Sequence, residues 1–213
     1  MVMKDHKGYR PKQRNTGSRK ERSIVLLSTE GKNKTETRYF TDLARHYGLN
    51  IQFAPGNYTD PVNMMKALIQ ECEKKELEAE LGDKAFCLVD SDVDPHKNEQ
   101  LSIADSMSGA KMIQLIVSSP CFEVWVLCHF SRSIKHPNSS SSVVDDVLKV
   151  LPGYSKDGEG LFRTLAPSVE EAVKKAKDLE RQCVNAGYRP HTVEFSPSTE
   201  IYKVIESLLS LGA

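Results

Sequence analysis

The sequence predicts an α/β fold, with a mostly parallel sheet of four strands flanked by helices and a helical C-terminal extension. Two observations lead to this prediction. Four short apolar runs have the length and composition of strands that are buried on both faces. Amphipathic stretches of helical length separate most of these runs, and this alternation is typical of parallel sheets.

The first half of the chain contains three of the predicted strands and two of the helices. Gly48 follows the first helix at a position suited to a C-terminal cap. Asp60 is the expected N-cap of the second helix, Pro61 lies in its first turn, and Gly82 is its expected end. The strands are expected at residues 23–27, 50–54 and 85–89, and the helices at 35–47 and 61–81.

The second half adds one strand and several helices. A polar run at residues 138–142 predicts a low-complexity loop. From these patterns we expect a basic flexible arm at residues 1–22, an α/β core at 23–132 and a helical extension at 133–213 packed on the core. The fourth strand is expected at 111–117, a mostly buried helix at 122–130, and further helices at 143–151, 169–186 and about 199–211.

Composition is that of a globular protein, with 39% hydrophobic and 27% charged residues among 213. No apolar run is long enough to cross a bilayer, and residues 1–22 lack the apolar segment of a signal peptide. We therefore expect a cytoplasmic protein without a membrane partner. The five cysteines form no CxxC pair, which favours buried free thiols over a zinc site or disulfides.

Charge is unevenly distributed, although the formal net charge is zero. The arm at residues 1–22 carries eight lysines and arginines against two acidic residues. Such an arm is either a contact for nucleic-acid phosphates or a solvated tail.

Acidic residues follow two of the predicted strands. Glu30 comes just after the first strand, and Asp90, Asp92 and Asp94 come at the end of the third. Because ligand sites of open parallel sheets lie beyond the carboxyl ends of the strands, we expect these carboxylates to meet at one edge. An oxygen-only set suits Mg²⁺ or Mn²⁺, which commonly take further ligands from phosphate groups. The sequence therefore predicts a metal site for phosphate chemistry.

Two other motif interpretations are excluded by particular residues. An EF-hand loop starting at Asp90 would have Pro95 at its glycine position and Leu101 at its glutamate position. The segment GKNKT at residues 31–35 lacks the upstream glycine of a Walker A motif. The DxD of metal-dependent glycosyltransferases and an ordinary acidic turn remain as alternatives.

Three segments in order resemble the RloB-like family of bacterial and archaeal proteins, which are often encoded near restriction-modification genes. They read EGKNKTETRYF, VDSDVD and SSPCFEVWVLCHF, and the closing SPSTEIYKVIESLL resembles the family's last helix. The family is similar to the Toprim fold of topoisomerases, bacterial primases and overcoming-lysogenization-defect nucleases. The resemblance implies a Toprim-like core in which Glu30, Asp90 and Asp92 hold Mg²⁺ for phosphodiester chemistry.

The implied activity is that of a nuclease acting on DNA or RNA in defence against phages or foreign DNA. Asp90 and Asp92 are the expected main metal ligands, directly or through water, and Glu30 is either a ligand or the general base. Asp94 is a candidate for a supporting position.

Two further acids are candidates for the same site. Glu36 resembles the second acid of the family's first motif, and either supports a second metal or favours the N-terminus of its helix. Glu123 interrupts an apolar segment, and a buried carboxylate is costly unless it is paired or metal-bound.

Two other functions remain open. A nucleic-acid-binding or regulatory subunit of a defence complex would need a separate ATPase chain, because this sequence has no Walker motif. A metal-dependent nucleotidyl or glycosyl transferase is the third possibility.

Overall fold

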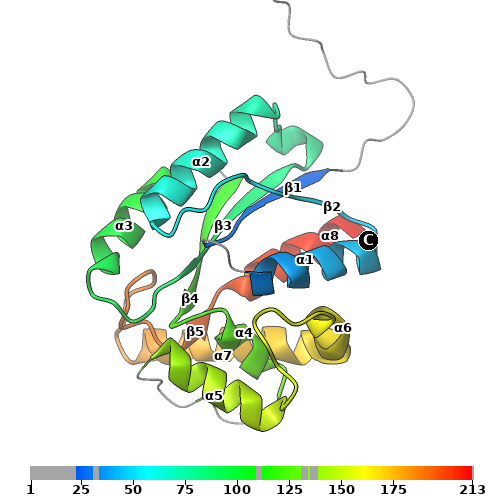
Figure 1. Ribbon diagram of the computed structural model, residues 1–213. Helices are drawn as coiled ribbons and strands as arrows, with labels where there is room; N and C mark the ends of the chain where they lie inside the picture. Colours follow the sequence, from blue (N-terminus) through cyan, green and yellow to red (C-terminus); the bar gives the residue numbers. More distant parts are fainter. Residues whose placement is uncertain (1–22, 31–33, 109–111, 131–133, 135–138, 213) are drawn as a thin grey trace, which may run out of the picture.

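The computed structural model describes residues 23–30, 34–108, 112–130, 134 and 139–212, so the predicted basic arm at 1–22 lies outside the described residues. In this part of the chain, one five-stranded sheet carries helices on both faces (Figure 1). None of the helices described combines the length and the apolar character that a bilayer crossing requires. All five cysteines are free and buried, as predicted.

The sheet has the strand order β2-β1-β3-β4-β5. Its strands are β1 (Ile24–Ser28), β2 (Asn50–Phe53), β3 (Lys84–Asp90), β4 (Ile113–Ser119) and β5 (Ser198–Thr199). Strands β1 to β4 are parallel to one another, whereas β5 runs antiparallel to β4.

The prediction of four strands was therefore wrong by one. β5 has only two residues, and it is a strand because Thr199 pairs with Ser118 and Ser198 pairs with Ser119. Two residues are too few to show a strand periodicity in the sequence. The last helix accordingly begins at Ile201 rather than at Thr199.

The helices differ from the prediction mainly between the third and fourth strands and in the second half. Two helices, α3 and α6, were not predicted, and the predicted helix at 61–81 is split into α2 and the 3₁₀ helix η1. The elements are α1 (Lys34–Tyr47), α2 (Pro61–Lys74), η1 (Ala79–Leu81), α3 (Lys97–Met107), α4 (Glu123–Cys128), α5 (Ser140–Val150), α6 (Leu161–Leu165), η2 (Ala166–Ser168), α7 (Val169–Asn185) and α8 (Ile201–Gly212).

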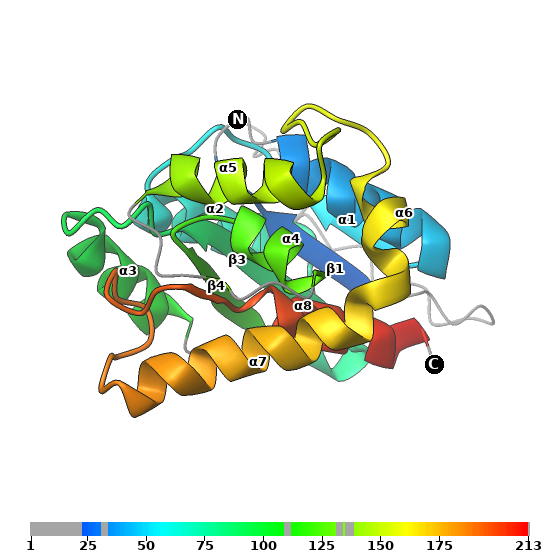
Figure 2. The same cartoon turned by 90° about the horizontal axis from the view of Figure 1, so that it is seen from below.

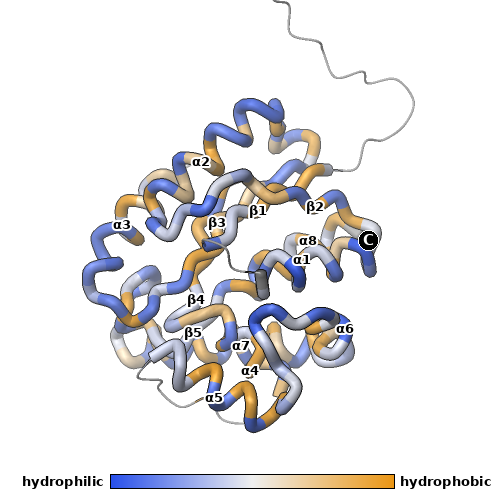
Figure 3. The backbone as a smooth tube through the Cα atoms, in the orientation of Figure 1, coloured by the Kyte–Doolittle hydropathy of each residue, from blue (hydrophilic) through white to orange (hydrophobic). Residues whose placement is uncertain are grey.

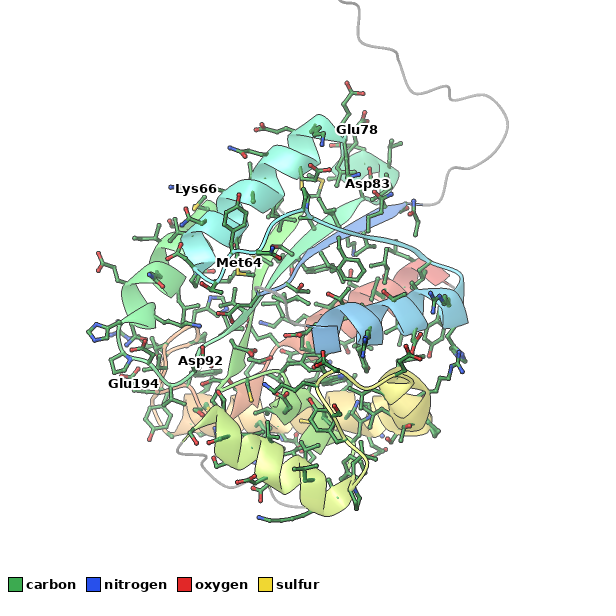
Figure 4. All side chains as sticks on the ribbon, viewed as in Figure 1. Met64, Lys66, Glu78, Asp83, Asp92 and Glu194 are labelled. Atoms are coloured by element: carbon green, nitrogen blue, oxygen red, sulfur yellow. The ribbon has the colours of Figure 1, made fainter. Side chains whose placement is uncertain are left out.

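Helix α2 illustrates how local sequence sets an element. Asp60 Oδ1 accepts the N–H of Asn63 at 2.8 Å, and Pro61 occupies the first turn, as predicted. Figure 4 shows Met64 on the sheet side of the helix and Lys66 on the opposite side, and Figure 3 shows the corresponding alternation of hydropathy along α2. Its buried residues are Pro61, Met64, Met65, Leu68, Glu71 and Cys72.

The sheet separates two hydrophobic cores. Helices α2 and α3 cover one face, where alternate strand residues such as Leu26, Cys87 and Val89 are buried. The larger core on the other face includes Leu27 and Leu88 and is covered by α1, α4, α5, α7 and α8. Figure 2 shows α4 lying between α5 and α7 on this face. Both faces of the central strands are thus buried, as their continuous apolar sequences predicted.

Candidate active site at the carboxyl edge of the sheet

The parallel strands bring Glu30 and Asp90 together. Glu30 lies two residues beyond the end of β1, and Asp90 is the last residue of the neighbouring strand β3. The backbone N–H of Asp90 donates to Glu30 Oε2 at 3.4 Å. Figure 4 shows Asp83 at one end of β3 and Asp92 at the other, carboxyl end. Glu30, Asp90 and Asp92 therefore lie at the carboxyl edge of the sheet, as predicted.

Lys97 joins the loops that follow β1 and β3. Its ammonium contacts Asp92 Oδ2 at 2.7 Å, the backbone oxygen of Asp90 at 2.9 Å and Glu30 Oε1 at 3.1 Å. The side chains of Lys97 and Glu30 are only 13% and 16% exposed. Burial opposes the charged form of Lys97, but the hydrogen bond to Asp92 and the two carboxylate charges raise its pKa. This lysine is therefore a charged member of the site.

Asp92 is held in an unusual backbone conformation. Asp92 and Val93 have φ angles of 52° and 55°, in the left-handed region that β-branched residues rarely adopt. The N–H of Asp92 donates to the carbonyl of Pro120 at 2.9 Å, and Ser140 Oγ donates to Asp92 Oδ1 at 3.1 Å. These contacts from the loop after β4 and from α5 direct the Asp92 carboxylate to the edge of the sheet.

Asp94 has a local structural role. Its Oδ1 accepts the N–H of His96 at 3.0 Å, and its backbone oxygen accepts the N–H of Lys97 at 2.9 Å. Asp94 therefore shapes the turn that starts α3, and its contacts are with that turn.

Glu123 is buried at the start of α4 with two partners from the loop before α6. It is 2% exposed, and its Oε1 accepts the hydroxyl of Tyr154 at 2.7 Å. The ammonium of Lys156 lies 3.3 Å from the same oxygen. Thr35 Oγ1 donates to the backbone oxygen of Lys156 at 2.8 Å, which attaches this loop to the first turn of α1. The expectation that a carboxylate at this position needs a partner is confirmed.

Glu36 is buried beside these groups, on the first turn of α1, with 3% of its surface exposed. We call Glu30, Glu36, Asp90, Asp92 and Glu123 the acidic cluster. They come from four segments of the chain: the loop after β1, the first turn of α1, the end of β3 with the loop after it, and the start of α4.

The members of the acidic cluster act on one another. Burial raises the pKa of Asp90 well above its ordinary value, and the charges of Glu36, Glu30, Glu123 and Asp92 raise it further. Burial, with the charges of Glu123 and Glu30, raises the pKa of Glu36 to about 8. Burial also raises the pKa of Glu30, although the neighbouring ammonium opposes this. Burial and the mutual repulsion of these carboxylates thus both favour their protonated forms.

The donor chemistry of the acidic cluster fits a hard divalent cation. All its side-chain donors are carboxylate oxygens, and a divalent ion would relieve the repulsion that, in addition to burial, raises the pKa of Asp90. Within the described residues, no three His, Cys, Asp or Glu side chains are arranged around a common point to hold an ion. Between Glu30 and Asp92, the Lys97 ammonium takes the oxygens that such an ion would use.

Sequence reasoning missed Lys97, Ser140 and Tyr154. A signal for Lys97 exists, because Asp94 and Pro95 are typical of a helix start and would place a lysine in the first turn. Ser140 lies in a polar run, and its partner Asp92 is 48 positions away in the chain. Tyr154 lies in a loop, and its partner Glu123 is 31 positions away. Neither segment has a sequence pattern that indicates such a contact.

Comparison with known proteins gives one family. The model described as RloB-like protein matches residues 25–208, a range that contains the whole acidic cluster. No curated protein and no solved structure matches the chain significantly.

Proposed function

The chain belongs to the RloB-like family, and from this membership and the acidic cluster we propose that it is a cytoplasmic, Mg²⁺- or Mn²⁺-dependent nuclease with a Toprim-like core. It acts on phosphodiester bonds of DNA or RNA in defence against phages or foreign DNA. The observation that carries the proposal is the meeting of Glu30, Asp90 and Asp92 at the carboxyl edge of parallel strands, with the pKa of Asp90 raised by burial and by the surrounding carboxylates.

Asp90 and Asp92 are the residues that would hold the ion, with Glu30 as a further ligand or as the general base. When bound, the ion supplies positive charge at the scissile phosphate and lowers the pKa of a bound water. Glu123, together with Glu36 once it is ionised, places additional negative charge next to Asp90 and so favours a cation at this edge.

The remaining chemistry belongs to the side chains of the protein. The raised pKa of Glu30 makes its carboxylate a better proton acceptor, as a general base requires. The Lys156 side chain is 52% exposed beside Glu123, so its ammonium can reach a phosphate oxygen. Tyr154 fixes the orientation of Glu123 through its hydroxyl group.

The test is cleavage of single-stranded, double-stranded and structured DNA and RNA, with Mg²⁺ or Mn²⁺ against EDTA. Asp90→Asn keeps the shape of the side chain and removes its charge, so cleavage should fall by about a hundredfold or more. Asp178→Asn is the matched control, because that carboxylate is half-exposed on α7 and pairs with Arg181. Metal-dependent cleavage that Asp90→Asn leaves intact would count against the proposal.

A second candidate function is a non-catalytic nucleic-acid-binding or regulatory subunit that works with a separate ATPase. The Lys97 ammonium favours it, because it already pairs with Glu30 and Asp92, the two carboxylates that a metal ion would need. This function predicts salt-sensitive binding of DNA or RNA that Asp90→Asn retains, with no turnover by either protein.

A further inference from the structure

We infer that Lys97 is the resident cation of the acidic cluster, and that a divalent ion binds between Glu30 and Asp92 by displacing its ammonium group. The inference rests on the proposed function, because it concerns the regulation of the same site. On this inference Lys97 competes with the metal ion for the two carboxylates. The strength of its ion pairs then sets the ion concentration at which the site fills.

The hydrogen bonds of Lys97 carry the first step. An ammonium group has three N–H donors, and three oxygens lie 2.7 to 3.1 Å from Lys97 Nζ. Two of these are carboxylate oxygens, Glu30 Oε1 and Asp92 Oδ2. All three donors are therefore used inside the site, and an ion that takes both carboxylate oxygens must displace the ammonium.

Burial distinguishes Lys97 from the other lysines that form ion pairs in the part of the chain that the structure describes. Its side chain is 13% exposed, against 52% for Lys156 beside Glu123 and 67% for Lys174 beside Glu171. Exposed pairs such as Lys174 with Glu171 are weak because water screens them. The pair of Lys97 with Glu30 is shielded, whereas Asp92 is 47% exposed. The two pairs join loops that are far apart in the sequence, so they hold those loops in one arrangement.

Charge favours the exchange once an ion is present. Glu30 and Asp92 with Lys97 retain one net negative charge, and Asp90 lies next to them. A divalent ion brings one more positive charge than the ammonium and can bind carboxylate oxygens that the lysine leaves unneutralised. Lys97 is the first residue of α3 and has a flexible four-carbon stem, so its ammonium can leave without movement of the helix.

The experiment measures Mn²⁺ affinity of the full-length protein by isothermal titration calorimetry, which needs no nucleic acid. Lys97→Met removes the competing charge and should tighten Mn²⁺ binding by about tenfold or more, because charge-assisted bonds no longer have to be broken. In EDTA the variant should have a lower melting temperature than wild type. Added Mn²⁺ should raise the melting temperature of the variant by more than that of wild type. Lys174→Met, which removes an exposed pair on α7, should match wild type in both measurements.

The outcomes separate this inference from the proposed function. Equal or weaker Mn²⁺ binding by Lys97→Met overturns the inference and leaves a metal-dependent nuclease intact. If neither wild type nor the variant binds Mn²⁺, the proposed cofactor is wrong and the inference is overturned with it. If Lys97→Met does not fold, Lys97→Gln keeps a donor for the Asp90 carbonyl and carries the same expectation.

Discussion

Replacing Glu36 by glutamine should stabilise the protein at alkaline pH and change little at acidic pH. Glu36 is 3% exposed. Burial, with the charges of Glu123 and Glu30, raises its pKa from the ordinary 4.5 to about 8. The folded protein therefore keeps a proton that the unfolded chain releases. The stability linked to this group is fully present below pH 4.5 and is lost as the pH rises through about 8.

The pKa difference sets the size of the effect. A carboxyl group whose pKa changes from 4.5 to about 8 on folding corresponds to about 5 kcal/mol of unfolding free energy. This is an upper limit, because the charge of Glu36 also raises the pKa of Asp90, so the two acids titrate together. Glu36→Gln has no charge to bury, so its free energy of unfolding at pH 9 should exceed that of wild type by roughly 2 to 5 kcal/mol.

Urea unfolding in EDTA at pH 5, 7 and 9 tests this, with fluorescence of the fully buried Trp125 as the signal. Glu171→Gln is the control, because that glutamate is 72% exposed on α7 and should show no pH-dependent difference. An advantage of Glu36→Gln that is the same at pH 5 and pH 9 would refute the reasoning. Adding Mn²⁺ at pH 9 should reduce the advantage, since a bound cation compensates the ionised glutamate.

Three other predictions concern stability. Tyr154→Phe leaves the buried Glu123 carboxylate without its hydroxyl donor and should lower the free energy of unfolding by about 1–3 kcal/mol, whereas Tyr58→Phe at a 45% exposed position should not. Burial lowers the pKa of His129 from 6.5 to about 4, so the stability linked to this group is fully present above pH 6.5 and is lost as the pH falls through 4. The loss amounts to at most about 3 kcal/mol of unfolding free energy. Urea unfolding of His129→Gln at several pH values should lack this dependence. Asp83 accepts the N–H groups of Ile24 and Glu78 through its two oxygens, and Asp83→Ala, which removes both acceptors, should cost about 1–3 kcal/mol and speed hydrogen exchange at Ile24.

The positions of Glu30 and Asp90 follow from the sequence because their information is local. Each lies at the end of a continuous apolar run, and strands of a parallel sheet that are buried on both faces place such ends at one edge. Glu123 was predicted to need a partner because it interrupts an apolar helix, and the partners are Tyr154 and Lys156. Which residues supply them was not predictable, since their loop has no periodic pattern.

Tertiary structure alone decided the fifth strand and the charge balance of the site. Ser198 and Thr199 form β5 only because β4 offers them unpaired backbone groups, and two residues carry no strand signal of their own. Lys97 neutralises Glu30, 67 residues away in the chain, because the loops after β1 and β3 meet at the edge of the sheet. The sequence by itself determined that Glu30, Asp90 and Asp92 meet at this edge, since strand ends are local features, whereas Asp94, which it also placed there, bonds within the turn before α3. Which cation neutralises them depends on contacts between distant segments, and these exist only in the folded chain.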